Sequence, residues 1–394
     1  MAARFDITQV RLRHYRSIAA CDVKLGPLTM LVGPNGSGKS NFLDALRYTA
    51  QGLSENLNNA LRERGGIGEV RRRSRGHPTS FGVEVRFQTN GYGGRYRYQV
   101  GAVRGGDYRV THEECVVASP ERWRGNRYYR VRDGRLEESS EPTMPAVSED
   151  RLYLVAASGL EPFRPVFDGL AAVNVYNLNP DAMRQLQKPE AGELLRRDGS
   201  NVASVLEKLR RERPDTKKRI EEYLSRIVEG VVAVDRRGYG AWETIDFRQT
   251  VAGDESPWTF PASSMSDGTL RALGVLVSLF AGSTAVASPV GIEEPEVALH
   301  PAAAGLLLDA LRDASESRQI LLTTHSPDLL DSPDIRPEEL LAVRSYRGNT
   351  QINYVDEGGL RAMREALLTP GELLRVDQLV PADGVPEQLE LFPS

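Results

Sequence analysis

The sequence predicts an α/β fold: a mixed or parallel core sheet flanked by helices, with an antiparallel β subdomain and a helical lobe. Three observations lead to this prediction. Residues 28–46 read as an apolar strand, a glycine-rich turn and an amphipathic helix. Residues 81–138 alternate apolar and polar positions, and residues 202–228 carry apolar residues at helical spacing. Because two further apolar strands follow near residues 290 and 320, both ends of the chain should contribute to the core sheet.

Length and composition set the broad class. The 394 residues can bury a large core, and this length suggests two or three domains. Apolar residues make up 40% and charged residues 26%, which is typical of globular proteins. The net charge of -4 excludes a polycation that coats nucleic acid, so DNA contact would need a local basic patch. Two cysteines, Cys21 and Cys115, form no disulfide framework and indicate the cytoplasm.

The strongest motif is LTMLVGPNGSGKSNFLDAL, near the start of the chain. Its segment from Gly33 to Ser40 matches G-x-x-x-x-G-K-[ST] at every fixed position, between a strand and a helix as a P-loop NTPase requires. Backbone N–H groups of such a loop surround phosphates at the positive end of a helix. We expect Lys39 to reach the β- and γ-phosphates and Ser40 to bind Mg²⁺. The expected nucleotide contacts are Gly33, Pro34, Asn35, Gly36, Ser37, Gly38, Lys39, Ser40 and Asn41.

Strand patterns follow the phosphate loop. Segments 81–87, 95–103, 108–117 and 127–138 have period-2 alternation, with turn sequences such as TNGYGG and RDGR between them. Such a series predicts antiparallel hairpins. Together with the phosphate loop they form the first expected unit, residues 1–150.

Helical spacing marks the second expected unit, residues 151–260. Apolar residues recur at i, i+3, i+4 and i+7 from Val202, and the same spacing returns between Ile220 and Val228. Pro214 separates the two patterns. Two short helices broken by a proline cannot form a long coiled coil, so we expect a compact lobe.

The third expected unit, residues 261–378, carries three short motifs. In SSMSDGTLRALGVL, a Ser-x-Gly turn at Ser266 opens an apolar helix. Glu293 follows 27 residues later at the end of an apolar strand, with Glu294 beside it. His325 ends another apolar strand, ILLTTHSPDLL, 31 residues after Glu294.

One uncharged stretch within this unit has two interpretations. Residues 273–292 are long enough to cross a bilayer. Their second half is rich in Gly, Ser, Thr and Pro, however, and a glutamate follows directly. We therefore favour a buried helix end, a loop at Pro289 and a short buried strand, and we expect no membrane partner.

The order and spacing of these motifs resemble the ATP-binding cassette (ABC) ATPases. IEEPE…LHP, THSP and the opening VRLRHYRSI before GPNGSGKSNFLDAL resemble the RecF/OLD-like branch, within the SMC/RecF superfamily of AAA-family predicted ATPases. The resemblance covers roughly residues 5–50 and 260–330, and it implies an ABC-type head without a coiled coil. No D-x-D pair follows His325, so we expect no Toprim nuclease domain. No glutamine could be assigned to the Q-loop of that family.

The resemblance also implies roles for particular residues. Glu293 would bind Mg²⁺ with Ser40, while Glu294 would polarise the attacking water and His325 would contact the γ-phosphate. With Lys39 these form the expected catalytic set, Glu294, His325 and Lys39. The expected signature, which acts on the nucleotide of a second subunit, is Ser266, Asp267 and Gly268.

Two functions remain open from the sequence. The first is a slow, Mg²⁺-dependent ATPase that acts in DNA maintenance by ATP-driven pairing of two heads. The second is the ATPase subunit of an antiphage or toxin complex that gates a separate effector protein. Both use ATP and Mg²⁺ and the same catalytic residues.

A basic segment offers a double-stranded DNA contact. RERGGIGEVRRRSRGHP contains Arg71, Arg72, Arg73 and Arg75 with flexible glycines and no aromatic residues. Phosphate-backbone binding needs this kind of surface, whereas base stacking does not match it. The alternative is a solvated loop.

The end of the sequence also has two interpretations. Residues 379–394 are rich in Pro, Gly and acids, which predicts a flexible tail. QLELF within it resembles the peptide by which bacterial replication and repair proteins dock on the sliding clamp. That resemblance implies contacts by Gln388, Leu389, Leu391 and Phe392. The alternative is that these apolar residues fold back on the protein as a latch.

Overall fold

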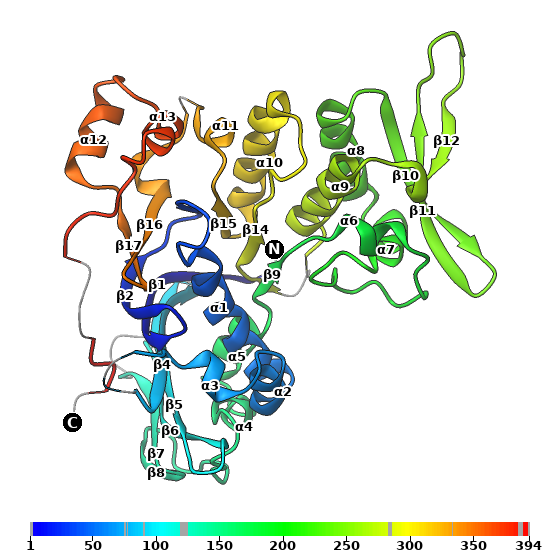
Figure 1. Cartoon of the computed structure of the whole chain (residues 1–394). Helices are drawn as coiled ribbons and strands as arrows, with labels where there is room; N and C mark the ends of the chain where they lie inside the picture. Colours follow the sequence, from blue (N-terminus) through cyan, green and yellow to red (C-terminus); the bar gives the residue numbers. More distant parts are fainter. Residues whose placement is uncertain are drawn as a thin grey trace.

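The computed structural model describes residues 3–74, 76, 78–89, 91–118, 125–282, 286–332, 334–384 and 389–392. It confirms the predicted α/β fold. A core sheet lies at the centre, an antiparallel sheet packs beside it, and a lobe of helices with a small third sheet extends to the other side (Figure 1). Among the described helices, none is long and apolar enough to cross a membrane.

The core sheet has the strand order β17-β16-β3-β15-β14-β9. Every neighbouring pair except β16–β17 is parallel. Strands β3 (Leu28–Val32) and β15 (Ile320–Thr324) are buried at every position and pair directly, so both ends of the chain build the core as predicted. The carboxyl ends of the parallel strands share one edge, where such sheets bind ligands. The other strands are β9 (Asn174–Tyr176), β14 (Val290–Glu293), β16 (Leu340–Tyr346) and β17 (Asn349–Tyr354).

The antiparallel sheet has the order β13-β1-β4-β5-β6-β7-β8, with β2 paired to β1, and the pair β1–β13 at its edge is the parallel exception among these described strands. Strands β4 to β8 confirm the hairpins that the alternating segments predicted. The strands are β1 (Ala3–Tyr15), β2 (Ile18–Lys24), β4 (Ser80–Thr89), β5 (Tyr92–Ala102), β6 (Tyr108–Val117), β7 (Arg127–Arg132), β8 (Arg135–Ser139) and β13 (Val286–Ala287).

The middle of the chain is less helical than expected. Helices α7 (Val202–Glu212) and α8 (Pro214–Ile227) have the predicted spacing and meet at Pro214. They pack against a three-stranded sheet that the sequence analysis did not predict, namely β10 (Val231–Tyr239), β11 (Trp242–Gln249) and β12 (Trp258–Pro261). Residues 151–260 also supply β9 to the core sheet.

Thirteen helices lie in the described part of the chain. Within the uncharged stretch, residues 273–280 form the end of α9 and residues 290–292 belong to β14, as the favoured interpretation predicted, while residues 286–287 form the short strand β13, which it did not predict. Besides α7 and α8 the helices are α1 (Lys39–Ser54), α2 (Leu57–Arg62), α3 (Ile67–Val70), α4 (Leu154–Ala157), α5 (Arg164–Ala171), α6 (Pro180–Arg184), α9 (Asp267–Phe280), α10 (Ala304–Ser317), α11 (Pro327–Leu330), α12 (Glu357–Arg364) and α13 (Pro370–Arg375).

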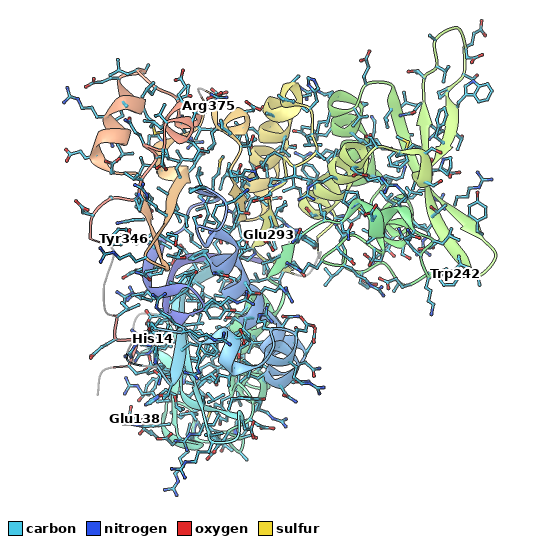
Figure 2. The ribbon with its side chains drawn as sticks, in the orientation of Figure 1. His14, Glu138, Trp242, Glu293, Tyr346 and Arg375 are labelled. Carbon is cyan, nitrogen blue, oxygen red and sulfur yellow. The ribbon has the colours of Figure 1, made fainter. Side chains whose placement is uncertain are left out.

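The core sheet separates two hydrophobic clusters. Leu31 of β3 packs with α1 and the antiparallel sheet, whereas Met30 and Val32 of the same strand pack with the helical lobe. This follows from the alternation of side chains along a strand. Glu293 lies at the end of β14, where the parts of the molecule meet (Figure 2).

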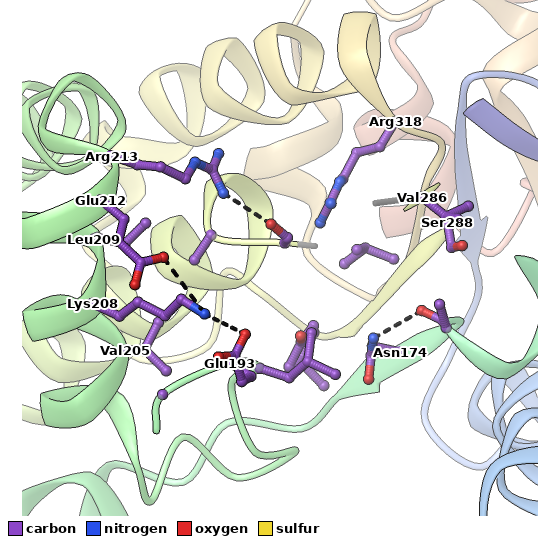
Figure 3. A pocket seen from close by; sticks show the side chains of 17 residues that line it. Asn174, Glu193, Val205, Lys208, Leu209, Glu212, Arg213, Val286, Ser288 and Arg318 are labelled. Atoms are coloured by element: carbon purple, nitrogen blue, oxygen red, sulfur yellow. Dashed lines mark hydrogen bonds and ion pairs between the residues drawn. The ribbon is translucent and has the colours of Figure 1, made fainter. Parts of the chain in front are cut away.

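A cavity of about 290 Å³ lies at the opposite, amino-terminal edge of the core sheet (Figure 3). Asn174 at the start of β9, Val290 at the start of β14 and Arg318 just before β15 line it. Helix α7 contributes the facing wall, so the cavity lies between the core and the helical lobe.

Candidate functional site

The glycine-rich loop joins β3 to α1. Gly36 and Gly38 have positive φ values of 75° and 103°, which glycine adopts without strain. A Cβ atom on Gly38 would lie 2.1 Å from the Thr350 Oγ1, and one on Gly33 would lie 2.0 Å from the Val343 carbonyl oxygen. The loop therefore needs glycine both for its path and for its neighbours. Lys39 begins α1, so the first N–H groups of a 16-residue helix face the loop.

Segments distant in sequence brace this loop. The Thr350 hydroxyl of β17 donates to the Ser37 carbonyl oxygen (2.8 Å) and also contacts the Ser17 hydroxyl (2.7 Å). The Asn41 side-chain amide donates to that Ser17 oxygen (2.6 Å). The expected contact residue Asn41 thus lies in a hydrogen-bond chain that links α1, the β1–β2 turn and β17.

Lys39 lies inside the loop. Its Nζ donates to the carbonyl oxygens of Gly33 (2.7 Å) and Pro34 (3.0 Å). Burial lowers the pKa of Lys39, while the nearby carboxylates of Glu294 and Glu296 act to raise it. The lysine and these two carboxyl groups therefore share one site. Ser40 is exposed on the first turn of α1.

The paired glutamates end β14. Glu294 has φ 47°, in the left-handed region, and its N–H donates to the Thr323 carbonyl oxygen (3.0 Å). Its Oε1 lies 3.1 Å from the His325 Nδ1. The structure thus brings together three of the residues that the sequence singled out, Lys39, Glu294 and His325.

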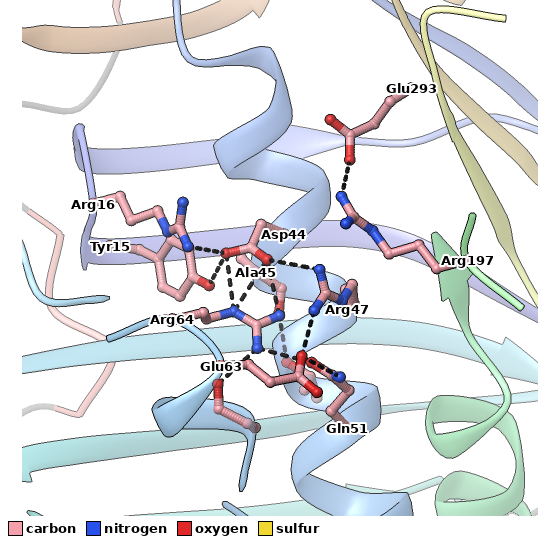
Figure 4. A network of polar contacts seen from close by, with 12 residues as sticks. Tyr15, Arg16, Asp44, Ala45, Arg47, Gln51, Glu63, Arg64, Arg197 and Glu293 are labelled. Carbon is pink, nitrogen blue, oxygen red and sulfur yellow. Dashed lines mark hydrogen bonds and ion pairs between the residues drawn. The ribbon is translucent and has the colours of Figure 1, made fainter. Parts of the chain in front are cut away.

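Glu293 has a partner that the sequence did not reveal. The Arg197 guanidinium donates to the Glu293 Oε1 (2.9 Å), and Figure 4 shows this pair beside a cluster of charges around Asp44 on α1. Asn177 also approaches from the same loop region, because its N–H donates to the Arg197 carbonyl oxygen (3.0 Å). Tyr176, the last residue of β9, pairs with Ile292, so Asn177 just after this strand stands level with Glu293.

Glu296 is a third carboxyl group at this edge. The Thr324 hydroxyl donates to its Oε1 (2.6 Å). Its Oε2 is buried and has no hydrogen-bond partner among the described residues, and burial raises the pKa of this side chain. Its place in EPE next to the paired glutamates was the only sequence signal for it.

Arg271 was also missed by the sequence analysis. This side chain of α9 is 8% exposed, and it donates to the carbonyl oxygens of Glu293 (3.2 Å) and Glu294 (3.0 Å). It also donates to the Leu178 carbonyl oxygen (2.8 Å), just after β9. One arginine thus holds the turn of the paired glutamates and the end of β9. A single cation within an apolar helix was the available signal.

The expected signature residues form the start of α9. The Ser266 hydroxyl accepts from the Thr269 N–H (3.1 Å) and caps the helix, while Asp267 pairs with Arg184. Gly268 is closely packed, since a Cβ there would lie 2.3 Å from the Ala298 carbonyl oxygen. Ser266 and Gly268 line an open groove of about 480 Å³ with residues 298–300, which follow the paired glutamates.

The arginine segment lies beside the phosphate loop. Arg71, Arg72 and Arg73 line a groove of about 320 Å³ together with Asn41 and Gly348. Arg72 donates to the carbonyl oxygens of Ser17 and Gly348, and burial lowers its pKa. Arg73 pairs with Glu69 and its side chain is 70% exposed. Arg75 lies outside the described residues.

The end of the chain packs on the antiparallel sheet. Leu391 is fully buried, and the Arg97 guanidinium donates to its carbonyl oxygen. The Phe392 ring stacks on His112 with centroids 4.9 Å apart, and the Arg97 Cζ lies 4.4 Å from its centre. Residues 389–392 therefore adopt the latch, unlike the flexible tail expected for 379–394. Gln388 lies outside the described residues.

Comparisons with known proteins place the chain in a family. A family described as "AAA domain, putative AbiEii toxin, Type IV TA system" matches residues 28–331. A "DNA replication and repair protein RecF" of Corynebacterium jeikeium is 42% identical over 62 residues, which span 15% of this chain and 15% of that protein.

Solved structures show the same fold at low identity. The crystal structure of an Smc head bound to the C-winged helix domain of ScpA has a TM-score of 0.57 and 16% identity, covering 90% of this chain and 99% of that chain. An Smc head with an extended coiled coil, bound to the C-terminal domain of ScpA from Pyrococcus furiosus, has a TM-score of 0.52 and 14% identity, covering 92% and 100%. Because the family match spans most of the sequence, this chain belongs to the AAA-domain family described above, and it is a RecF/SMC-like ATP-binding cassette ATPase.

Proposed function

We propose that this chain binds and hydrolyses ATP with Mg²⁺ at the carboxyl edge of the core sheet, by ATP-driven pairing of two heads. The observation that supports it best is the contact of 3.1 Å between Glu294 and His325, at the ends of neighbouring strands. The same Glu294 carboxylate acts on the pKa of Lys39 in the phosphate loop. A carboxylate, an imidazole and an ammonium group around a phosphate loop are the groups that phosphoryl transfer to water needs.

Each residue has a role in this proposal. Lys39 leaves its loop carbonyls to bind the β- and γ-phosphates, and Glu294 orients and polarises the attacking water. His325 holds the Glu294 carboxylate in place and contacts the γ-phosphate. No glutamine of this sequence was assigned to the Q-loop of the family. In this proposal the Asn177 side-chain amide, level with Glu293, takes that position.

The residues present fit a magnesium ion. The Ser40 hydroxyl and the Glu293 carboxylate are oxygen ligands of the kind that Mg²⁺ prefers. Bound Mg²⁺ neutralises charge on the β- and γ-phosphate oxygens. Arg197 donates to one carboxylate oxygen of Glu293, Oε1, so the other oxygen would remain available to the ion.

The pairing of heads rests on the signature. Ser266, Asp267 and Gly268 supply N–H groups at the start of α9 beside an open groove, and in ABC-type heads such a turn acts on the nucleotide of the second subunit. The likeness to Smc heads supports this arrangement in fold. A homodimer would therefore form two composite sites.

The biological setting we favour is DNA maintenance. The short match to a RecF protein supports it, together with the arginine segment. The same setting would give the QLELF peptide a use in docking on a sliding clamp. A second candidate is the gating of a separate effector in a defence or toxin complex, which the toxin named in the family description favours.

Trapping the dimer tests the reaction. We expect Glu294→Gln to stop hydrolysis and to form an ATP-bound dimer, because nucleotide binds while the water is not polarised. Lys39→Ala should lose ATP binding and stay monomeric. Light scattering after gel filtration with saturating ATP and Mg²⁺ measures both. Glu222→Gln, an exposed glutamate of α8, is the control and should behave like the unmodified chain.

A Glu294→Gln chain that binds ATP yet stays monomeric would contradict the pairing of heads. Hydrolysis that persists in Glu294→Gln would contradict the role of this residue. Duplex DNA added to the unmodified chain then separates the two settings. Stimulated hydrolysis supports DNA maintenance, whereas an unchanged rate favours a gating subunit.

A further inference from the structure

The cavity at the amino edge of the core sheet is separate from the ATP site. Strand β14 begins at Val290 in the cavity wall and ends at Glu293 on the opposite edge. At about 3.3 Å per residue, roughly 10 Å of strand separates the two. The cavity therefore belongs to neither the phosphate loop nor the signature groove.

Arg318 points into this cavity (Figure 3). Arg318 is only 8% exposed. Among the residues that the structure describes, no hydrogen-bond acceptor or carboxylate contacts its guanidinium. The guanidinium packs against Gly282, since a Cβ atom on this glycine would lie 1.7 Å from the Arg318 Nη2. A buried cation without a partner is costly, and burial lowers the pKa of Arg318.

A second cation lies next to it. Arg213, between α7 and α8, donates to the carbonyl oxygens of Gly282 (2.9 Å) and Phe280 (3.1 Å), and it has no carboxylate partner in the described part of the chain. The two guanidinium groups act on each other, since Arg213 contributes to lowering the Arg318 pKa. Two neighbouring positive charges at one end of a cavity favour an anion.

A hydroxyl group completes this end of the cavity. The Ser288 Oγ is buried and has no hydrogen-bond partner in the part of the chain that the structure describes. At the far wall, by contrast, Lys208 is already paired with Glu193 and Glu212. The polar groups that have no partner in the described part of the chain therefore lie around Arg318. The apolar side chains of Val205 and Leu209 line the α7 wall of the cavity.

We propose that this cavity binds a small organic anion. Its carboxylate or phosphate group pairs with Arg318 and Arg213 and accepts a hydrogen bond from Ser288. Its apolar body lies against Val205 and Leu209. Guanidinium groups bind both kinds of oxyanion in a bidentate manner, so the shared chemistry is a planar or tetrahedral oxyanion on an apolar group.

Such a ligand would touch both the helical lobe and the core. Arg213 holds the carboxyl end of α9, the helix that begins with the signature, while Arg318 and Ser288 belong to the core. Occupancy would therefore bias the position of the helical lobe relative to the core.

Binding of two probes tests the proposal. Phenyl phosphate and benzoate are titrated into the Lys39→Ala chain at constant ionic strength, so that neither hydrolysis nor the phosphate loop contributes. Calorimetry and the thermal unfolding temperature are the readouts. We expect at least one probe to bind and to raise the unfolding temperature. Binding of phenyl phosphate alone assigns a phosphate ester, and binding of benzoate alone assigns a carboxylate.

Arg318→Gln and Arg318→Met should weaken this binding at least tenfold. Arg210→Gln, on the exposed side of α7, should leave it unchanged. Without probe, Arg318→Met should unfold at the same or a higher temperature, because it removes a buried charge for which the described residues provide no partner. The proposal is overturned if neither probe binds or if both Arg318 variants bind like the parent. A lower unfolding temperature in both variants would also overturn it, since Arg318 would then hold the fold.

Discussion

Arg271 connects the signature helix to the turn that carries the paired glutamates. Its contacts are all to main-chain carbonyl oxygens, at Leu178, Glu293 and Glu294. Glu294 has a left-handed backbone, which a glutamate adopts only when its surroundings hold it there. We therefore infer that Arg271 positions Glu294 through the main chain for the proposed reaction.

We expect Arg271→Met to lower kcat for ATP about 10- to 100-fold, because the Glu294 carboxylate would be misplaced. A rise of about 1.4 kcal/mol in the activation free energy already lowers the rate about tenfold. KM for ATP should change much less, because the phosphate loop is intact. Arg271→Lys should recover part of the rate. Steady-state kinetics of both variants measure kcat and KM for ATP separately.

Arg361→Gln, an exposed arginine of α12, is the matched control for this series. A KM for Arg271→Met that rises as much as kcat falls would contradict a positioning role.

The sequence revealed the residues that belong to spaced motifs, such as Lys39, Glu294 and His325. It did not reveal Arg271, Glu296 or Arg318, because their importance follows from burial and from the partners they have or lack. No spacing in the sequence encodes that information. The pairing of Arg197 with Glu293 was equally hidden, since it joins residues 96 positions apart.

At the scale of elements, the end of the chain and the β subdomain form one packed unit. Leu391 contacts the backbone of β4 so closely that a Cβ on Gly82 would lie 2.6 Å from its Cδ1. Arg97 on β5 and His112 on β6 hold Phe392. The apolar residues that would dock on a sliding clamp are the same ones that pack here, so the two contacts compete.

This competition predicts an order of affinities. A synthetic EQLELFPS peptide should bind a bacterial sliding clamp at micromolar concentration, and the intact chain should bind more weakly because its latch must open first. Arg97→Ala should raise the affinity of the intact chain for the clamp toward that of the peptide. Phe392→Ala should abolish clamp binding by both. Fluorescence anisotropy with labelled clamp measures the series.

Arg135→Ala, exposed on β8, should leave the affinity of the intact chain unchanged. No binding of the peptide at high micromolar concentration would leave only the latch.

The predictability of the elements followed their length and exposure. Strands β4 to β8 alternate over many residues and were predicted from the sequence. Strand β9 has three residues, too few to show a period. Strand β10 ends in four exposed residues, and β11 has five consecutive buried ones, so neither shows clean alternation.

At the scale of the whole molecule, net charge and local charge oppose each other. The chain carries a net charge of -4, which repels DNA, so duplex binding would depend on a small surface such as the arginine segment. That segment also lies near the phosphate loop. Arg72 donates to the Ser17 carbonyl oxygen, and Asn41, just after the loop, donates to the Ser17 hydroxyl and lines the same groove.

Reversing the charge of Arg71, Arg72 and Arg73 together should weaken duplex DNA binding. It should also flatten the salt dependence by about one released counterion for each lost phosphate contact. Arg73→Glu alone should affect DNA but not ATP, since this side chain is 70% exposed. Arg72→Glu alone should also weaken ATP binding. Anisotropy of labelled duplex at several salt concentrations and of labelled ATP measures both.

A triple variant with the parent's affinity and salt slope would identify the segment as a solvated loop.

The brace from Thr350 to the phosphate loop has a consequence for biosynthesis. Strand β3 and helix α1 lie within the first 54 residues that the ribosome synthesises. Thr350 and the strands β15 and β16, which flank β3, are synthesised about 300 residues later. Until they arrive, the loop lacks its contacts with Thr350 and β3 has neither of its partners. A stalled nascent chain of 300 residues thus carries the complete phosphate-binding motif without the pocket. Such long-range closure makes folding slow and leaves apolar strands open to chaperones.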